Sequence, residues 1–395
     1  MKKIFDYIVI TVGNDYQEKF LQEKLDKRRE VIYEQTECKI IIEKKKIGSG
    51  GALLKIINEM ETDNKKILLI NSAGKSTRMP LYADKGKICM PTFSDRNSIM
   101  LDDILEEVLP IGEKMDSGIL VVSGDCTTIY KKNLTKSIKN NTAFSVLVDA
   151  EIGEKHGVFV VEDGVLKQSL QKENIKILKE KNAISVDNKV NIDTGIIYFN
   201  QDMINTLKCL KYNNTMLNLY TDLIYPLCLK SELEEYSYQK SDVEVTEELL
   251  QVRQEIWDLI KNKTIDIKFL EDGKFVHYGT TKEFLNIAFN KNNSENVIIN
   301  SNIVGKITSK NYIENSDILD NAKIGKNSVI MDSIVNCDVP ENVILKTIKC
   351  SKKFFTILYG NEKNTYNSNF EIYVLDNDRE KASKKAIEFY NNIRN

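Results

Sequence analysis

Residues 67–91 constrain the fold of this 395-residue chain more than any other segment. The segment opens with an apolar run, residues 67–70, whose length and branched side chains are typical of a buried parallel strand. A turn of small residues follows at 72–74, and the cations after it are Lys75, Arg78, Lys85 and Lys87. Small residues let backbone N–H groups approach phosphate oxygens, and cations neutralise the remaining charge. The segment therefore predicts a phosphate site at the end of a strand.

Two common phosphate-binding motifs do not fit this segment. Gly74-Lys75-Ser76 matches the end of a P-loop, but the first glycine of that motif would have to stand at Leu69. The chain also lacks the G-x-G-x-x-G fingerprint of dinucleotide-binding folds. What remains is an R-x-P motif that begins at Arg78, followed by a K-x-x-x-P motif that begins at Lys87. The alternative is a basic surface loop in a lysine-rich chain.

Length and charge narrow the class of protein. A chain of 395 residues is expected to form about two or three domains. Its net charge of −2 argues against general affinity for nucleic acids or membrane surfaces. No apolar run is long enough to span a bilayer, and the N-terminus lacks the apolar segment of a signal peptide. The seven scattered cysteines indicate neither a disulfide framework nor a zinc site. We expect a cytoplasmic protein, with no nucleic-acid or membrane partner and an oligomeric state that the sequence leaves open.

Strands and helices alternate through the first third of the chain. We predict strands at 6–15, 38–42, 67–70 and 118–123, with helices between them at 17–28, 52–60 and 98–109. Such alternation predicts an α/β fold with a mostly parallel sheet and right-handed crossovers. Ligands of these folds bind at the carboxyl ends of the strands, where the 48–51 turn, the 72–78 turn and Asp125 are expected to meet.

The pattern changes from about Asn296. Apolar residues then recur mostly every five or six positions, at Ile298, Ile303, Ile313, Ile318, Ile324, Val329, Ile334 and Val339. This spacing suits the short coils of a β-helix, which must stack on each other to bury a core. Ile324-Gly325 is the clearest hexapeptide-like pair, and residues 376–395 are predicted to form a C-terminal helix.

In this order the segments resemble the fucose-1-phosphate guanylyltransferase (GDP-L-fucose pyrophosphorylase) family, including the transferase half of bifunctional fucokinase/GDP-fucose pyrophosphorylases. The resemblance covers about residues 6–350 and is carried by DYIVITVGNDYQ, IGSGGALL, ILLINSAGKSTRMP, GKICMP, GILVVSGD, HGVFV, SLQK, DTGIIYF, LYTDLIYPL and FVHYGTTKEFL. Ala73 departs from the family, which usually has a second glycine there, and no kinase half is present. The resemblance implies a Rossmann-like nucleotidyltransferase domain at 1–290, a left-handed-type β-helix domain at 291–350 and a C-terminal extension at 351–395.

The implied reaction is nucleotidyl transfer from GTP to L-fucose-1-phosphate. An oxygen of the sugar phosphate attacks the α-phosphorus of GTP, pyrophosphate leaves, and the product is GDP-L-fucose. Mg²⁺ neutralises much of the charge on these polyanions and needs carboxylate ligands. Asp125 and Asp193 match the two metal-binding carboxylates of the family, and Asp125 counts among the catalytic residues. The alternatives are a turn aspartate that caps a helix for Asp125 and an ordinary strand-start aspartate for Asp193.

The resemblance also assigns residues to the substrates. Arg78 and Lys87 are expected to hold the phosphates of the triphosphate and to assist catalysis, the alternative being solvated surface charges. The glycines expected to let the backbone approach substrate are Gly48, Gly50, Gly51 and Gly74; those at 48–51 alternatively only turn the chain into a helix. Gly157 is expected to face the sugar and Lys172 the sugar phosphate. His277 is expected to be structural.

Three other functions are weighed against this one. The nearest is a nucleotidylyltransferase for another deoxysugar phosphate or another nucleoside triphosphate, because nothing in the sequence identifies guanine directly. An acyltransferase built on the β-helix is disfavoured, since no histidine lies between Asn296 and Lys349. The third is a non-catalytic protein that binds sugar nucleotides.

Overall fold

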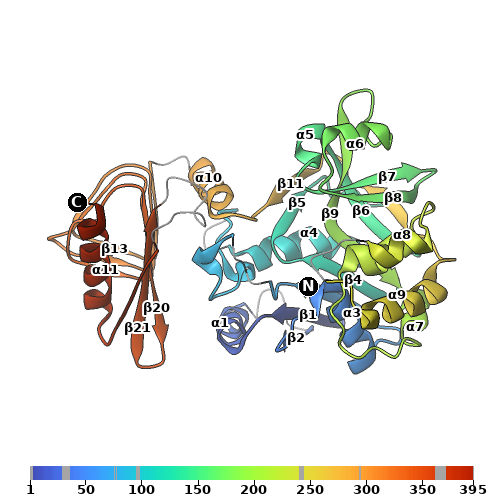
Figure 1. The fold of residues 1–395 in the computed structure, drawn as a ribbon, viewed down its shortest axis with the longest axis horizontal. Coiled ribbons are helices and arrows are strands. Elements are labelled where there is room, and N and C mark those ends of the chain that lie inside the picture. Colours follow the sequence, from blue (N-terminus) through green and yellow to red (C-terminus); the bar gives the residue numbers. More distant parts are fainter. Residues whose placement is uncertain are drawn as a thin grey trace. The chain divides into compact units, whose positions relative to one another are not determined.

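The computed structural model describes residues 3–28, 36–74, 76, 78–94, 98–239, 244–292, 295–360 and 371–394. The chain divides into two compact units (Figure 1). Unit 1 comprises Met1–Gly74, Gly86–Cys89 and Met100–His277. Unit 2 comprises Lys75–Lys85, Met90–Ile99 and Tyr278–Asn395. No helix of the described residues combines the length and the apolar character that a membrane span needs.

These units differ from the predicted domains. The division falls after His277 rather than at 290, and residues 351–395 belong to unit 2 rather than to a separate extension. Two loops from the first hundred residues also belong to unit 2. Sequence position alone does not reveal such loops, because their partners lie more than 200 residues further along the chain.

A nine-stranded sheet forms the centre of unit 1 as far as its residues are described, in the order β2-β1-β3-β4-β9-β6-β10-β8-β7. Its strands are β1 (Tyr7–Val12), β2 (Glu37–Ile42), β3 (Lys66–Asn71), β4 (Gly118–Ser123), β6 (Thr142–Asp149), β7 (Gly157–Glu162), β8 (Val165–Gln171), β9 (Lys189–Asn200) and β10 (Asp266–Phe269). A separate antiparallel pair joins β5 (Cys126–Ile129) to β11 (Lys274–His277). Residues 67–70 are fully buried in β3, as expected of an apolar run in a central strand.

The sheet is mixed, with parallel pairs among β1 to β4 and between β6 and β10. Strands β1 to β4 are parallel as predicted, but β9 runs antiparallel to both β4 and β6. Strands β7 and β8 form an antiparallel hairpin. Helices α5 (Ala150–Gly153) and α6 (Ile175–Glu180) join strands that run in the same direction, β6 to β7 and β8 to β9. The chain reverses at the two-residue turn between β7 and β8, a connection that antiparallel strands can use and parallel strands cannot.

Helices pack on this sheet through apolar faces. The helices of unit 1 are α1 (Asp15–Asp26), α3 (Gly48–Glu59), α4 (Met100–Lys114), α7 (Gln201–Leu207), α8 (Leu233–Tyr238) and α9 (Glu247–Ile260), with a π-helix η3 (Leu219–Ile224). Helices α3, α7 and α9 share one buried core with strands β1, β3 and β4 (Figure 1). Inside this core the guanidinium of Arg253 lies 2.8 Å from the carboxylate of Asp222, and both side chains are fully buried.

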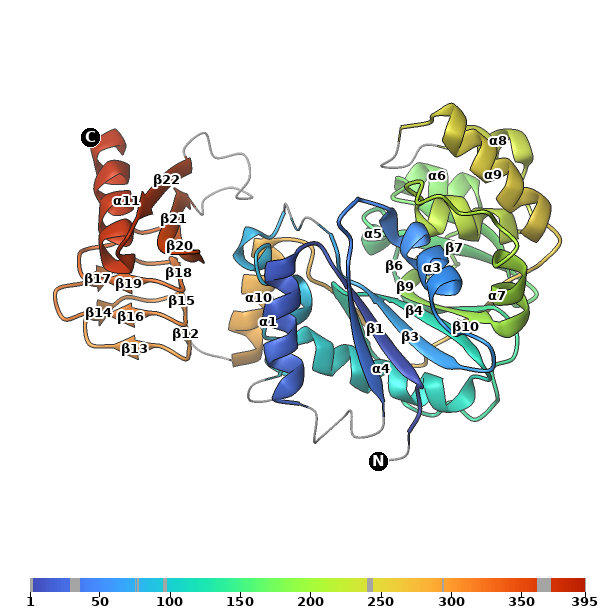
Figure 2. The ribbon, with the colours of Figure 1, turned by 90° about the horizontal axis from the view of Figure 1, so that it is seen from below.

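Unit 2 contains α10 (Thr281–Asn292), stacked short strands and a terminal helix. Strands β12 (Asn296–Ile299), β15 (Asn311–Glu314), β18 (Val329–Met331) and β20 (Val343–Cys350) form one parallel ladder. Strands β13 (Asn302–Ile303), β16 (Asp317–Ile318) and β19 (Ile334–Val335) form a second, and β14 (Lys306–Ile307) with β17 (Lys323–Ile324) a third (Figure 2). The chain thus passes through the ladders in turn, and most of the recurring apolar residues point into one core, although Ile298 is exposed.

The last segment of unit 2 extends the first ladder. Strand β20 pairs antiparallel with β21 (Lys353–Gly360), which pairs antiparallel with β22 (Glu371–Asp376). Helix α11 (Arg379–Arg394) packs on these strands through Ala382, Ala386 and Tyr390 (Figure 2). The predicted C-terminal helix is therefore present, and it closes the core of unit 2.

Candidate functional site

Two carboxylates meet at one edge of the sheet in unit 1. Asp125 follows the end of β4, and Asp193 lies within β9, which pairs with β4. Gly195 (φ +76°) lies beside Ser123, so that a Cβ added to Gly195 would stand 3.1 Å from the Cβ of Ser123. The Sγ of Cys126 donates a hydrogen bond to the carbonyl of Thr194 at 3.4 Å. Asp125 and Asp193 therefore lie on two neighbouring chain segments, close to where these segments contact each other.

Asp125 is held by a lysine, a hydroxyl and an imidazole. The Nζ of Lys87 lies 2.9 Å from Oδ2 of Asp125, and Oγ of Ser123 donates to Oδ1 at 2.8 Å. The Nε2 of His277 lies 4.0 Å from Oδ2. Burial by itself would raise the pKa of Asp125, but the charges of Lys87 and His277 and the two hydrogen bonds lower it below the ordinary value. Asp125 is therefore ionised at neutral pH, although only 33% of its side chain is exposed.

Asp193 has a different environment. Its Oδ1 accepts a hydrogen bond from the N–H of Gly195 at 2.9 Å, and the hydroxyl of Tyr220 donates a second. Among the described residues Asp193 forms no ion pair, and burial raises its pKa to about 6 despite both hydrogen bonds. A buried carboxylate at a strand edge, without a cationic side chain beside it, has the character of a cation ligand.

Both carboxylates act on the same neighbouring side chains. Burial raises the pKa of the Cys126 thiol, and the negative charges of Asp125, Glu107 and Asp193 add to the effect. Burial likewise raises the pKa of the Tyr220 phenol, with further contributions from Asp193, Cys126 and Asp125. The structure therefore brings the two predicted metal ligands, together with Lys87, into one electrostatic environment.

The β7–β8 hairpin borders this environment. A Cβ added to Gly157 would lie 3.2 Å from the Cβ of Asp193, so the glycine leaves room beside the carboxylate. Lys172 is exposed, has φ +54° and donates its backbone N–H to the carbonyl of His156 at 3.1 Å. Gly157 thus lies next to Asp193, whereas Lys172 is bonded to the residue before Gly157, and its contact with the sugar phosphate stays a prediction.

His277, which lies beside Asp125, packs against a second histidine, His156. The ring centroid of His156 lies 5.1 Å from that of His277, and 5.1 Å from that of Phe275. The prediction that His277 is structural did not anticipate its contact with Asp125. The available signal was position, because His277 ends β11 and this strand pairs with β5, which begins at Cys126, directly after Asp125.

The glycines at 48–51 approach another part of unit 1. Gly48 has φ +74°, and a Cβ there would collide with the carbonyl oxygen of Leu217. The N–H of Gly50 donates to the same oxygen at 3.0 Å, and a Cβ on Gly51 would collide with the hydroxyl of Tyr212. Close packing against residues 212–218 thus accounts for these glycines, and their role in substrate binding stays a prediction.

The turn after β3 is described in part. Gly74 is exposed, and a Cβ there would meet nothing within 4 Å. Lys75 lies outside the described residues. Arg78 belongs to unit 2, where its side chain is exposed and its carbonyl accepts a hydrogen bond from the N–H of Thr281 at 3.2 Å. Its predicted contact with the triphosphate therefore stays a prediction.

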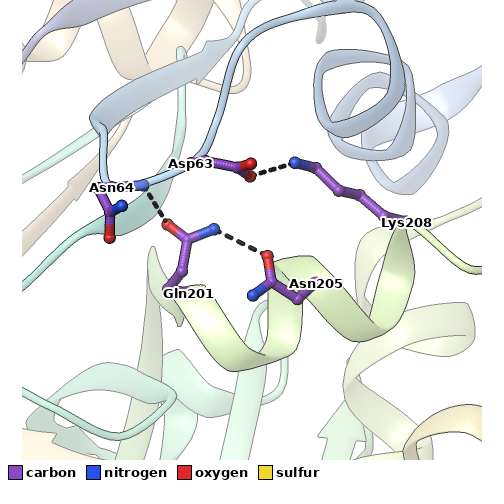
Figure 3. A pocket seen from close by; sticks show the side chains of 5 residues that line it. All are labelled: Asp63, Asn64, Gln201, Asn205 and Lys208. Carbon is purple, nitrogen blue, oxygen red and sulfur yellow. Dashed lines mark hydrogen bonds and ion pairs between the residues drawn. The ribbon is translucent and has the colours of Figure 1, made fainter.

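A surface pocket elsewhere in unit 1 lacks these features. It has a volume of about 390 Å³ and is lined by Asp63, Asn64, Gln201, Asn205 and Lys208 (Figure 3). It lies at the opposite edge of the sheet, where β3 begins and β9 ends. Its polar groups bond to one another, including an ion pair between Lys208 and Asp63 (Figure 3). The pocket is therefore a poor candidate for binding a polyanion.

The donor atoms near Asp125 suit one kind of metal ion. No cluster of three or more His, Cys, Asp or Glu side chains that could hold a metal occurs among the described residues. Mg²⁺ is commonly bound by one or two carboxylates that are completed by substrate phosphates and water. Asp125 and Asp193 fit that requirement.

Comparisons with known proteins agree on one protein family. Residues 59–392 match a family described as the Fucose pyrophosphorylase domain. Fucose-1-phosphate guanylyltransferase of Homo sapiens is 25% identical over 348 residues, covering 74% of this chain and 56% of that protein. The protein of the same name from Mus musculus is 24% identical, covering 93% of this chain and 75% of that protein. L-fucokinase/L-fucose-1-P guanylyltransferase of Bacteroides fragilis is 24% identical, covering 63% and 27%. This chain thus spans little more than half of the human relative's length.

Proposed function

This chain belongs to the fucose pyrophosphorylase family, and from that premise we propose that it transfers a guanylyl group from GTP to L-fucose-1-phosphate. One phosphate oxygen of the sugar attacks the α-phosphorus of GTP and forms a new P–O bond. The bond from the α-phosphorus to the bridging oxygen breaks, and pyrophosphate leaves. The attacking phosphate is already anionic, so the reaction depends on positioning and charge neutralisation rather than on a covalent intermediate.

The observation that carries the proposal is the charge arrangement at the carboxyl end of β4. A lysine that is 8% exposed lies 2.9 Å from Asp125, and Asp193 lies at the same edge of the sheet. A non-catalytic binding protein has no need for a buried lysine and two carboxylates there. The enzyme interpretation is therefore favoured over simple sugar-nucleotide binding.

In this proposal each residue has a separate task. Asp125 and Asp193 would hold Mg²⁺, which when bound supplies positive charge to the phosphates. Lys87 and Arg78 neutralise the triphosphate and stabilise the departing pyrophosphate. Lys172 reaches the phosphate of the sugar from the β7–β8 hairpin, and the glycines Gly48, Gly50, Gly51, Gly74 and Gly157 allow close approach of substrate.

The proposal includes two further points. Three short parallel ladders support the interpretation of residues 291–350 as a left-handed-type β-helix domain. We also place the protein in the cytoplasm, a reducing compartment that suits its seven free cysteines. A nucleotidylyltransferase for another deoxysugar phosphate or another nucleoside triphosphate remains the alternative.

The test is pyrophosphate release by the purified full chain. We expect release only when GTP, L-fucose-1-phosphate and Mg²⁺ are all present, and no release when a chelator removes the metal. A panel with ATP, CTP and UTP, and with mannose-1-phosphate and glucose-1-phosphate, measures specificity. Faster turnover of another pair would favour the alternative substrate, and no turnover of any pair would contradict the proposed enzyme.

A further inference from the structure

The loop that carries the R-x-P motif is attached to the short-strand ladders of unit 2 by buried polar side chains. Tyr82, in the 3₁₀-helix η1 (Pro80–Tyr82), is 1% exposed. Its hydroxyl lies 3.0 Å from the hydroxyl of Tyr312 and donates a hydrogen bond to the carboxylate of Glu314. The ring of Phe284 packs edge-on against Tyr82, with centroids 5.3 Å apart. All these groups belong to unit 2.

Two ion pairs strengthen the attachment. The Nζ of Lys85 lies 2.7 Å and 2.6 Å from the two carboxylate oxygens of Asp332. The Nζ of Lys346 contacts both the carboxylate of Asp84 and the carbonyl of Leu81. The two lysines are 5% and 2% exposed respectively. Four residues of the loop, Leu81, Tyr82, Asp84 and Lys85, are therefore bonded to β15, to β20 and to the residue that follows β18.

These bonds are directional, and directionality is what distinguishes them from apolar packing. Burying a charge is unfavourable unless it is paired, and an apolar contact of equal volume often gives equal or greater stability. A buried ion pair does, however, favour one geometry over its alternatives. A loop fixed in this way has one defined conformation, which is what a phosphate-binding arginine requires.

We infer that Lys85, Asp332 and Lys346 are positioning residues for nucleotidyl transfer. They hold the loop that follows Arg78, while α10 holds the Arg78 carbonyl through the N–H of Thr281. The bonds of residues 81–85 and of the Arg78 carbonyl thus fix the backbone that directly follows this arginine. This inference rests on the proposed function.

The experiment uses the full chain and the variants Asp332→Asn and Lys346→Met. Each variant removes one charge of a buried pair with little change in volume. We expect kcat/KM for GTP to fall about tenfold or more, because small misplacements of positioning groups have large kinetic effects. The KM for L-fucose-1-phosphate should change by less than about twofold if the loop acts on the triphosphate. Hydrogen–deuterium exchange of residues 79–85 should become faster.

The control is Lys385→Met. Lys385 forms an ion pair of 2.6 Å with Asp376 in the same unit, and this pair joins α11 to the end of β22. We expect this variant to keep the kinetics and the loop exchange of the parent chain. Lys346→Arg, which keeps the positive charge, should restore part of the activity that Lys346→Met loses.

The outcomes separate the inference from the proposed function. A parent chain that releases no pyrophosphate refutes the function. An active parent whose folded Asp332→Asn and Lys346→Met variants keep its kinetics and loop exchange refutes only the positioning role. If those variants fail to fold, Tyr82→Phe removes the hydroxyl and keeps the ring. Unchanged GTP kinetics in that variant would likewise refute the inference, and a selective loss would support it.

Discussion

At the scale of single residues, the local environment gives opposite pKa shifts to two carboxylates at the same edge of the sheet. Burial favours the neutral form of Asp125, but the charges of Lys87 and His277 and the hydrogen bonds from Lys87 and Ser123 together lower its pKa. The pKa of Asp193 is raised to about 6 because burial outweighs its hydrogen bonds. Asp125 was predictable, since it directly follows a buried strand and a glycine. The contact of Asp125 with His277 was not, because it depends on strand pairing between residues about 150 positions apart.

Substitution of Asp125 tests the predicted metal site. Asp125→Asn removes the charge that faces Lys87 and keeps the volume of the side chain. We expect pyrophosphate release to fall by about 10²-fold or more, as for the loss of other preorganised charges, while the protein stays folded with a lower unfolding temperature because buried Lys87 loses its charged partner. Asp149→Asn is the matched control, because Asp149 forms a 2.9 Å ion pair with Lys189 at the surface. Full activity of Asp125→Asn would remove Asp125 from the site.

A buried acid that the proposed reaction does not use predicts a pH effect on stability. Burial raises the pKa of Glu107 to about 8, against an ordinary value of 4.5. Between these values the unfolded chain loses the proton and the folded chain keeps it, so Glu107 destabilises the fold as pH rises. Glu107→Gln should therefore gain free energy of unfolding relative to the parent, by about 1.4 kcal/mol per pH unit. Urea unfolding from pH 5 to 8 measures this difference, and a constant difference would contradict the assignment.

At the scale of elements, the local sequence pattern predicts which segments form strands and helices better than it predicts the direction in which a strand runs. Strands β1, β3 and β4 and the amphipathic helix α9 were predictable because their apolar residues follow the periods of strands and helices. The direction of β9 was not, since a buried strand has the same composition whichever way it runs. The reversal occurs at the two-residue turn between β7 and β8, and β9 keeps the direction of β8.

A pair of glycines tests how tightly α3 is packed. Gly48 and Gly164 have similar positive φ values, +74° and +81°, but only Gly48 faces a carbonyl oxygen where a Cβ would stand. Gly164→Ala should cost about 1 kcal/mol of unfolding free energy from backbone strain alone. Gly48→Ala should cost more, because it adds a collision with Leu217. Chemical denaturation measures both losses of unfolding free energy. Equal losses would mean that the backbone at the start of α3 moves away from Leu217 at no cost in free energy.

At the scale of the whole molecule, unit 2 is assembled from three separate segments. Tyr82 and Lys85 supply partners for Tyr312 and Asp332, which lie more than 200 residues later in the chain. No local pattern in residues 78–85 indicates such partners, so the sequence predicted the short-strand ladders of this unit but not the loops that belong to it.

A fragment of residues 278–395 tests this assembly. Without the two loops it would leave Glu314, Asp332 and Lys346 buried beside empty space or exposed to water, and unpaired buried charges are strongly destabilising. We expect the fragment to unfold at a much lower temperature than a fragment to which residues 78–85 are added as a peptide. Circular dichroism during heating measures this, and equal unfolding temperatures with and without the peptide would contradict it.

This interleaving of segments limits how such a protein can be recombined. A chimera joined at residue 278 would inherit its ladders from one parent and the loops that complete them from the other. The lysines of one parent would then lie beside acidic residues of the other parent. These side chains have not been selected to pair with each other. Exchange between relatives is therefore expected to give a folded protein only when all three segments come from the same parent.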